Sequence, residues 1–310
     1  MHRDDLTPHA PPLPQGTAGP WRKEVGTSGL AAARGVRGIF GQPYINLERY
    51  IDTTSFPLLH EEVCLALAQI PAGYTGGSHR SMRIMPDGRE HEAYGDYGEV
   101  IRSMTAEQFE VFRRLADDPS AIPPDARNTL EFGEERAISL SRRQMLWLEV
   151  RFGVYFPWKF YVELIPNRYW GDKSNAEGKT FTRIAKTFFP KTIEFVQSLP
   201  FQQIGRCNIM GLQSFDHGTL HRDGDPDEQD EPDHFITFVP GGDKRLFLWD
   251  PVERREIFVD GRVYWFNDFD YHGVGSAPYF RYSIRVDGIF DDDFLERLQS
   301  DVKTGGGEST

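Results

Sequence analysis

The sequence predicts an α+β protein, in which a largely helical N-terminal half packs against an antiparallel β core. Two observations predict this division. Apolar residues recur at helical spacing at several places between about residues 54 and 198. From Phe201 onward, short apolar runs alternate with turn signals such as residues 240–243 and 260–261. Short strands at this spacing are typical of an antiparallel sandwich or barrel.

The chain is expected to have four parts. Residues 1–38 are rich in Pro and Gly and are expected to form a flexible tail. Residues 39–198 are expected to be a mainly helical buttressing region, and residues 199–290 the β core. Residues 291–310 are expected to form a C-terminal helix with a frayed end.

Helix signals recur through residues 39–198. Pro57 suits a helix first turn, and apolar residues then share one face until Pro71 stops the run. Further helices are expected at about residues 105–116, 141–150 and 181–198, with a bend or restart at Pro190 in the last. An aromatic-rich stretch at residues 155–170 is expected to pack where the helical part meets the β core, or to line a substrate pocket. The expected strands are residues 204–212, 235–239, 245–249, 262–266 and 279–290.

Composition restricts the class of protein. Of the 310 residues 39% are apolar, and the formal net charge is −12, which argues against a nucleic-acid partner. No run of 18 apolar residues occurs, and the first 25 residues lack the apolar segment of a signal peptide. Cys64 and Cys207 fit no zinc pattern and indicate reduced core thiols. We therefore expect a cytoplasmic protein with no membrane partner.

A metal site is predicted from His221, Asp223 and His272. Residues two apart in a strand point to the same side, so His221 and Asp223 can face the interior together. His272 lies 49 residues beyond Asp223 (272 − 223), which leaves room for intervening strands. Two histidines and one carboxylate occupy one face of a metal and leave other positions open, as non-haem Fe(II) oxygen chemistry requires.

The region around His272 resembles the Fe(II)/2-oxoglutarate-dependent oxygenases, especially their prolyl-hydroxylase and aspartyl/asparaginyl-hydroxylase branches. In those, an arginine opens the last strand nine or ten residues after the second metal histidine, as Arg281 follows His272 here. The resemblance covers residues 199–290 and implies a double-stranded β-helix (jelly-roll, cupin-like) core. The aspartyl-hydroxylase branch lacks the carboxylate ligand, whereas this chain keeps Asp223, which favours hydroxylase over halogenase chemistry.

The resemblance also implies roles for individual residues. The triad would hold Fe(II), with 2-oxoglutarate and O₂ as co-substrates, and Arg281 would pair with the distal carboxylate of 2-oxoglutarate. Arg285 faces the same side of the strand and is the alternative clamp, or a contact for a substrate carboxylate. Ser283, between the two arginines, is a further hydrogen-bond donor to that carboxylate. Asn208 is a candidate contact for 2-oxoglutarate or substrate, or a core amide.

The predicted reaction is hydroxylation of an unactivated C–H bond, with 2-oxoglutarate converted to succinate and CO₂. The substrate class is a free amino acid, an amino-acid-derived metabolite or a peptide side chain, and desaturation or cyclisation would use the same residues. Two alternatives remain open: a cupin-type metal-dependent dioxygenase or isomerase that does not use 2-oxoglutarate, and a non-catalytic β-sandwich binding module. Residues 223–233 hold seven acids in eleven positions and form either a solvated loop or a lid that attracts a cationic substrate. Neither the substrate nor the oligomeric state follows from the sequence.

Overall fold

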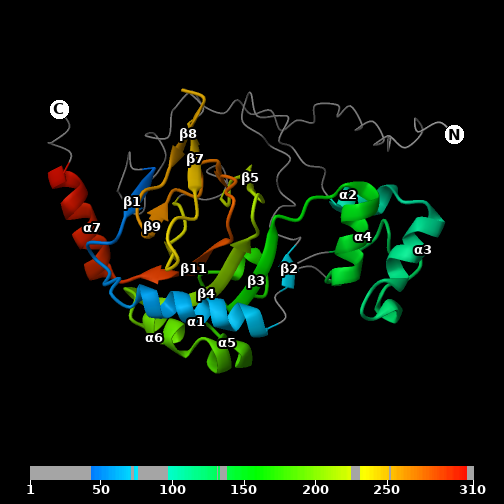
Figure 1. Cartoon of the computed structure of the whole chain (residues 1–310), viewed down its shortest axis with the longest axis horizontal. Helices are drawn as coiled ribbons and strands as arrows, with labels where there is room; N and C mark the ends of the chain where they lie inside the picture. Colours follow the sequence, from blue (N-terminus) through cyan, green and yellow to red (C-terminus); the bar gives the residue numbers. More distant parts are fainter. Residues whose placement is uncertain are drawn as a thin grey trace.

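Two antiparallel sheets and several helices make up the part of the chain that the structure describes (Figure 1). The computed structural model describes residues 43–70, 73–75, 97–130, 132, 138–224, 231–250 and 253–305. The expected tail at residues 1–38 and the acidic stretch 225–230 lie outside the described residues.

The larger sheet has seven strands in the order β1-β9-β6-β11-β4-β3-β2. Its strands are β1 (Tyr44–Asn46), β9 (Val263–Phe266), β6 (Phe235–Phe238), β11 (Arg281–Phe290), β4 (Phe201–Leu212), β3 (Trp158–Ile165) and β2 (Gly73–Thr75). β3 lies within the range 39–198 that the sequence predicts to be mainly helical, yet it pairs with β4 along most of its length.

The smaller sheet has four strands in the order β5-β10-β7-β8. These are β5 (Gly218–His221), β10 (His272–Val274), β7 (Leu246–Asp250) and β8 (Arg255–Phe258). From β4 to β11 the chain crosses repeatedly between the two sheets, and successive strands lie in opposite sheets except for β7 and β8, which pair with each other. The five strands expected from the sequence correspond to β4, β6, β7, β9 and β11 and are confirmed.

Three helices cover one face of the larger sheet, below β11, β4 and β3 in Figure 1. They are α1 (Phe56–Gln69), α5 (Arg183–Phe188) and α6 (Pro190–Gln197), and α6 restarts at Pro190 as predicted. Phe56 of α1 packs edge-on against Phe195 of α6, with ring centroids 5.5 Å apart. Phe195 in turn lies 4.9 Å from Phe238 of β6, which ties helices and sheet into one core.

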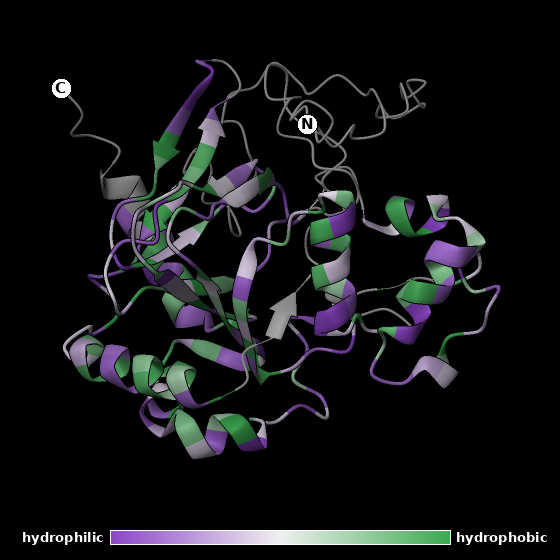
Figure 2. Ribbon diagram, turned by 45° about the vertical axis from the view of Figure 1, so that its right-hand side comes forward, coloured by the Kyte–Doolittle hydropathy of each residue, from purple (hydrophilic) through white to green (hydrophobic). Residues whose placement is uncertain are grey.

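A second apolar cluster is built from α2 (Tyr97–Ser103), α3 (Ala106–Arg114) and α4 (Arg142–Phe152). Capping boxes begin α3 and α4, where Thr105 and Ser141 accept from the backbone three residues on. Two 3₁₀ turns, η4 (Pro119–Ala121) and η5 (Trp170–Asp172), and the C-terminal α7 (Asp292–Gly305) complete the described elements. Figure 2 shows hydrophobic and hydrophilic residues alternating along these helices. None of the described helices is both long and apolar enough to cross a membrane.

β11 divides its side chains between the two faces of the larger sheet. Tyr282, Ile284 and Val286 join the core under the helices. The alternate residues are Arg281, Ser283, Arg285 and Asp287, and all four are buried as well. A strand with polar alternation normally turns that face to water. Here the polar face is turned toward the smaller sheet, and the candidate site lies between the two sheets.

Candidate metal centre

Three metal-binding side chains meet where β5 pairs with β10. His221 ends β5, His272 begins β10, and the two are register partners in adjacent strands. Asp223 follows β5 by two residues. One ligand atom from each of the three lies within 4.8 Å of the other two, and the described residues contain no other such cluster of His, Cys, Asp or Glu.

Both imidazoles are held with Nε2 toward the centre of the triad. Nδ1 of His221 donates to the carbonyl of Thr219 at 2.8 Å, and Nδ1 of His272 to that of Asp270 at 3.0 Å. Because a carbonyl can only accept, Nδ1 carries the proton and the lone pair is on Nε2. Burial, reinforced by His221, lowers the pKa of His272 to about 3, so His272 is in the neutral form that binds metals.

Asp223 is held through its backbone and its carboxylate. Its N–H donates to the carbonyl of Asp268 at 3.0 Å. Arg285 Nη1 donates to Oδ2, while Oδ1 lies 3.4 Å from His221 Nε2. Burial on its own raises the pKa of the Asp223 carboxyl, but the charge of Arg285 and the contact with His221 outweigh burial and hold the pKa well below its usual range. Asp223 is therefore ionised.

This donor set fits a divalent first-row transition metal. Two neutral imidazole nitrogens and one carboxylate oxygen form the facial triad of non-haem iron sites, with open positions on the opposite side. The structure thus brings together the three residues singled out in the sequence. It differs in one respect, since Asp223 lies in the turn after β5 rather than within a strand. The hydrogen bond to Asp268, and not strand alternation, sets its direction.

The face of the larger sheet that meets the metal site carries buried polar atoms with no partner among the described residues. Arg285 of β11 lies between its register partners, Asn208 of β4 and Thr237 of β6. Four buried atoms make no hydrogen bond to a described residue: Arg285 Nη2, Asn208 Oδ1, Thr237 Oγ1 and the hydroxyl of Tyr264 on β9. The amide nitrogen of Asn208 does have a partner, because Nδ2 donates to the Tyr161 hydroxyl at 3.0 Å. A buried polar atom without a partner costs about 1–3 kcal/mol. Buried polar atoms of this kind are normally satisfied by an ordered water or a polar ligand.

Lys244 is a buried cation that sequence reasoning missed. It lies between β6 and β7 and is 4% exposed. Its Nζ donates to Ser283 Oγ and lies 4.7 Å from the ring centre of Trp158, and no carboxylate among the described residues is within ion-pair distance. Burial, with the charges of Arg281 and Arg285, lowers the pKa of Lys244 to about 7. An ammonium so placed favours the entry of an anion.

Arg281, the clamp predicted from spacing, is largely engaged by the backbone. Its two terminal nitrogens donate to four carbonyls, those of Gln213, Asp216, Gly275 and Tyr279. These carbonyls belong to the β4–β5 and β10–β11 connections, so the guanidinium ties two loops together. Its Nε has no partner among the described residues and is the nitrogen that Arg281 can still offer a ligand.

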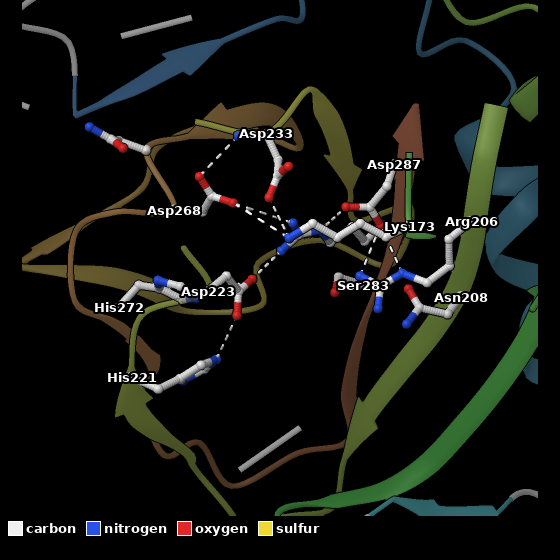
Figure 3. A network of polar contacts seen from close by, with 12 residues as sticks. Lys173, Arg206, Asn208, His221, Asp223, Asp233, Asp268, His272, Ser283 and Asp287 are labelled. Carbon is white, nitrogen blue, oxygen red and sulfur yellow. Dashed lines mark hydrogen bonds and ion pairs between the residues drawn. The ribbon is translucent and has the colours of Figure 1, made fainter. Parts of the chain in front are cut away.

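A second ion cluster lies beside Asp223 (Figure 3). Lys173 contacts Asp233 Oδ2, and its Nζ lies 4.0 Å from Asp268 Oδ2. Burial raises the pKa of Asp268 well above its usual range, with Asp233 adding to the effect and Lys173 opposing it. Gly205 of β4 makes room for this cluster, because a Cβ there would lie 2.2 Å from the carbonyl oxygen of Lys173.

The spare histidines near the site have other roles. His217 stacks on Tyr155 with ring centroids 4.9 Å apart. His234 Nδ1 accepts from the N–H of Phe290 at 3.1 Å. Neither belongs to the group of converging ligand atoms.

Comparison with known proteins gives partial likenesses. No protein-family model and no curated protein matches the sequence. A 2OG-Fe(II) oxygenase-family oxidoreductase from Burkholderia pseudomallei aligns with 48% of this chain and 78% of its own, at 11% identity and a TM-score of 0.28. A Pseudomonas putida prolyl-4-hydroxylase aligns with 34% of this chain and 65% of its own, at 12% identity and a TM-score of 0.23.

A third solved structure is a viral collagen prolyl hydroxylase from Paramecium Bursaria Chlorella virus-1, in a 2OG complex. It aligns over 42% of this chain and 79% of its own, at 11% identity and a TM-score of 0.24. All three likenesses are low in identity and in TM-score. The chemistry of the site is therefore derived from its own geometry.

Proposed function

We propose that the protein is an Fe(II)- and 2-oxoglutarate-dependent oxygenase that hydroxylates an unactivated C–H bond. The observation that carries the proposal is the triad of His221, Asp223 and His272 together with the buried cations Lys244 and Arg281, which pair with no carboxylate in the part of the chain that the structure describes. A divalent metal would bind the three side chains of the triad. An organic dianion that reaches from the metal to the buried cations would pair with their positive charges.

The strand order supports a double-stranded β-helix as the core. β9, β6, β11 and β4 are neighbours in the larger sheet, and β8, β7, β10 and β5 in the smaller one. Eight strands wound so that successive strands move between two facing sheets form a jelly roll. In this arrangement the start of β10 and the end of β5 meet, which is where the two histidines lie.

The buried cations support 2-oxoglutarate as the co-substrate, because it carries a carboxylate at each end. Lys244 and Ser283 offer an ammonium and a hydroxyl side by side to the distal carboxylate. Arg281 can add its Nε. Lys244 is a stronger clamp than Arg281, since its ammonium pairs with no carboxylate of the described residues, while the terminal nitrogens of Arg281 already donate to carbonyls.

The residues of this chain bind and orient the reactants. Bound Fe(II) supplies the redox chemistry, in which 2-oxoglutarate, O₂ and R–H become succinate, CO₂ and R–OH. The triad leaves positions open for the co-substrates. Phe266, whose ring lies 4.6 Å from that of His272, gives the metal an apolar side that excludes water. Asn208 and Thr237 offer unpartnered polar atoms to the co-substrate or to the substrate.

We propose an amino acid, an amino-acid-derived metabolite or a peptide side chain as the substrate. Such molecules present polar groups that suit the free acceptor and hydroxyl of Asn208 and Thr237. Desaturation or cyclisation would use the same residues, and the product distinguishes these outcomes.

Succinate formation tests the proposal. The purified protein with Fe(II), O₂ and 2-oxoglutarate is expected to release succinate and CO₂ in equal amounts, slowly alone and faster with the right member of a metabolite panel. His272→Ala is expected to release neither. If the protein binds iron but releases no succinate with any member of the panel, the result would instead support a cupin-type enzyme that does not use 2-oxoglutarate. If the protein binds no iron, the result would contradict both proposals of an enzyme.

A further inference from the structure

Arg285 contacts the metal site directly, and its side chain is fixed from every side. It is 4% exposed, and its guanidinium carbon lies 3.8 Å from the ring centre of Phe235 and 5.9 Å from that of Phe266. Its Nε donates to Asp287 Oδ1 at 2.9 Å, while Nη1 donates to Asp223 Oδ2. A guanidinium held in this way by rings and carboxylates presents one nitrogen to Asp223 in a single orientation.

We propose that Arg285 is a positioning residue for the metal, which keeps Asp223 a one-oxygen ligand and so keeps the remaining coordination positions open. This inference rests on the proposed function. A carboxylate can bind a metal through one oxygen or through both. Arg285 Nη1 donates to Oδ2, which lies 3.9 Å from His272 Nε2, and Oδ1 lies 3.4 Å from His221 Nε2. Because the hydrogen bond from Arg285 competes with a metal for Oδ2, we assign Oδ1 to the ion.

The position of Arg285 depends on a chain of alternating charges that begins on the next strand. Arg206 of β4 donates from Nε to Asp287 Oδ2 at 2.9 Å, and its Nη2 lies 2.9 Å from the same oxygen. Asp287 is fully buried and holds Arg285 through its other oxygen. Figure 3 shows Arg206, Asp287 and Asp223 in this arrangement. Two buried cations thus alternate with two carboxylates, and each charge is compensated by its neighbour.

Asp268 fixes the same ligand from the other side. Its carbonyl accepts from the N–H groups of Asp223 and Gly224, at 3.0 and 3.1 Å. Its carboxyl Oδ2 lies 3.9 Å from Arg285 Nη2. Asp268 therefore holds the backbone of Asp223, and Arg285 holds the carboxylate of Asp223. Asp268 and Arg285 also lie next to each other. Partners of this kind change metal affinity by about 10–100-fold when they are removed.

Two effects of Arg285 on a bound cation oppose each other. Its positive charge repels the ion, whereas its hydrogen bond holds the ligand oxygen in place. Arg285→Gln removes both the repulsion and the fixed geometry. Arg285→Lys keeps the charge but replaces the two separate nitrogens that donate to Asp287 and Asp223 with one ammonium that lacks the planar geometry of the guanidinium. The pair of variants separates charge from geometry.

The test measures Co(II) binding to the full chain by calorimetry, together with the visible absorption of the bound Co(II), without 2-oxoglutarate. Arg285→Gln is expected to raise the Co(II) Kd about 10–100-fold and to change the absorption, since the freed carboxylate can bind through both oxygens. Arg285→Lys is expected to be intermediate. Arg113→Gln, which removes a guanidinium paired with Glu110 on α3 and away from the triad, is the matched control and keeps the wild-type Kd and spectrum.

Each outcome either supports or contradicts the positioning role of Arg285. If Arg285→Gln is folded and has the wild-type Kd and spectrum, the inference is wrong. It is equally wrong if Arg285→Gln keeps the wild-type Co(II) Kd and spectrum but weakens 2-oxoglutarate binding in a separate titration of the metal-loaded protein, because Arg285 would then be the clamp that the sequence left as an alternative. If Arg285→Gln does not fold, the same comparison on Arg285→Lys decides. Wild-type protein that binds no Co(II) would contradict the proposed function as well.

Discussion

Lys244 donates a hydrogen bond to Ser283 of β11, although the two residues lie 39 positions apart in the sequence. The ammonium has no carboxylate partner among the described residues, and Ser283 shares its face of β11 with Arg285, which contacts Asp223 of the metal triad. The contact joins a connection between β6 and β7 to the strand that carries Arg281 and Arg285. Substitutions of Lys244 and Ser283 therefore test whether 2-oxoglutarate is the co-substrate.

Replacing Lys244 should weaken 2-oxoglutarate binding. Removing one partner of a buried charge pair costs about 2–5 kcal/mol, so Lys244→Met is expected to raise the 2-oxoglutarate Kd by roughly 30-fold or more. Ser283→Ala should have a smaller effect, about tenfold, because it removes one hydrogen bond to a charged group. Calorimetry with the metal-loaded protein measures both. Unchanged affinity in Lys244→Met would show that the anion binds elsewhere.

The affinity for 2-oxoglutarate should depend on pH through Lys244. Burial and the charges of Arg281 and Arg285 lower its pKa to about 7. Below that pH the lysine is already charged and binding is constant; above it, binding must draw a proton from solution. The affinity should then fall by up to about tenfold per pH unit. Calorimetry in buffers of different ionisation enthalpy should show proton uptake, and Lys244→Arg should abolish it.

Arg281 should matter for stability. Its Nη2 donates to the carbonyls of Asp216 and Gly275, both at 2.6 Å, and so joins two loops. Hydrogen bonds from a charged donor contribute about 1.5–3 kcal/mol each, and Arg281→Ala is expected to lower the free energy of unfolding by roughly 2–4 kcal/mol. Urea denaturation measures the loss. If Arg281→Ala is as stable as the wild type but binds 2-oxoglutarate more weakly, Arg281 is the residue that pairs with the distal carboxylate of 2-oxoglutarate.

Gly205 should not tolerate a side chain. A Cβ there would lie 2.2 Å from the backbone oxygen of Lys173, so Gly205→Ala must displace the segment that carries Lys173. We expect a loss of about 1–3 kcal/mol or more in unfolding free energy. Gly171→Ala is the control, because the atom nearest to its Cβ is 3.3 Å away on the side chain of Tyr169. Equal stability of the two variants would contradict this account of the packing.

The metal triad could be predicted from the sequence because its spacing is local. His221 and Asp223 are two residues apart, and the pairing of β5 with β10 then needs only to bring His272 opposite. Helix starts at Pro57 and Pro190 were likewise visible, since each proline marks a first turn.

Lys244 could not be predicted, because it follows Gly241, Gly242 and Asp243 in a segment that reads as a solvated turn. Its burial depends on Trp158 and Ser283, which come from distant strands. β3 was missed although its sequence alternates, with Trp158, Val162 and Leu164 buried on one face and the opposite face only half-buried. It lies inside the aromatic-rich stretch 155–170, which we interpreted as packing between the helical part and the β core.

The central claim is tested most directly by anaerobic titration of the protein with Fe(II) and then 2-oxoglutarate. We predict a weak visible charge-transfer band that appears only when both are present, is absent in His272→Ala, and needs much more 2-oxoglutarate in Lys244→Met. Iron that binds tightly to the wild-type protein, with no band at any 2-oxoglutarate concentration, would contradict the claim.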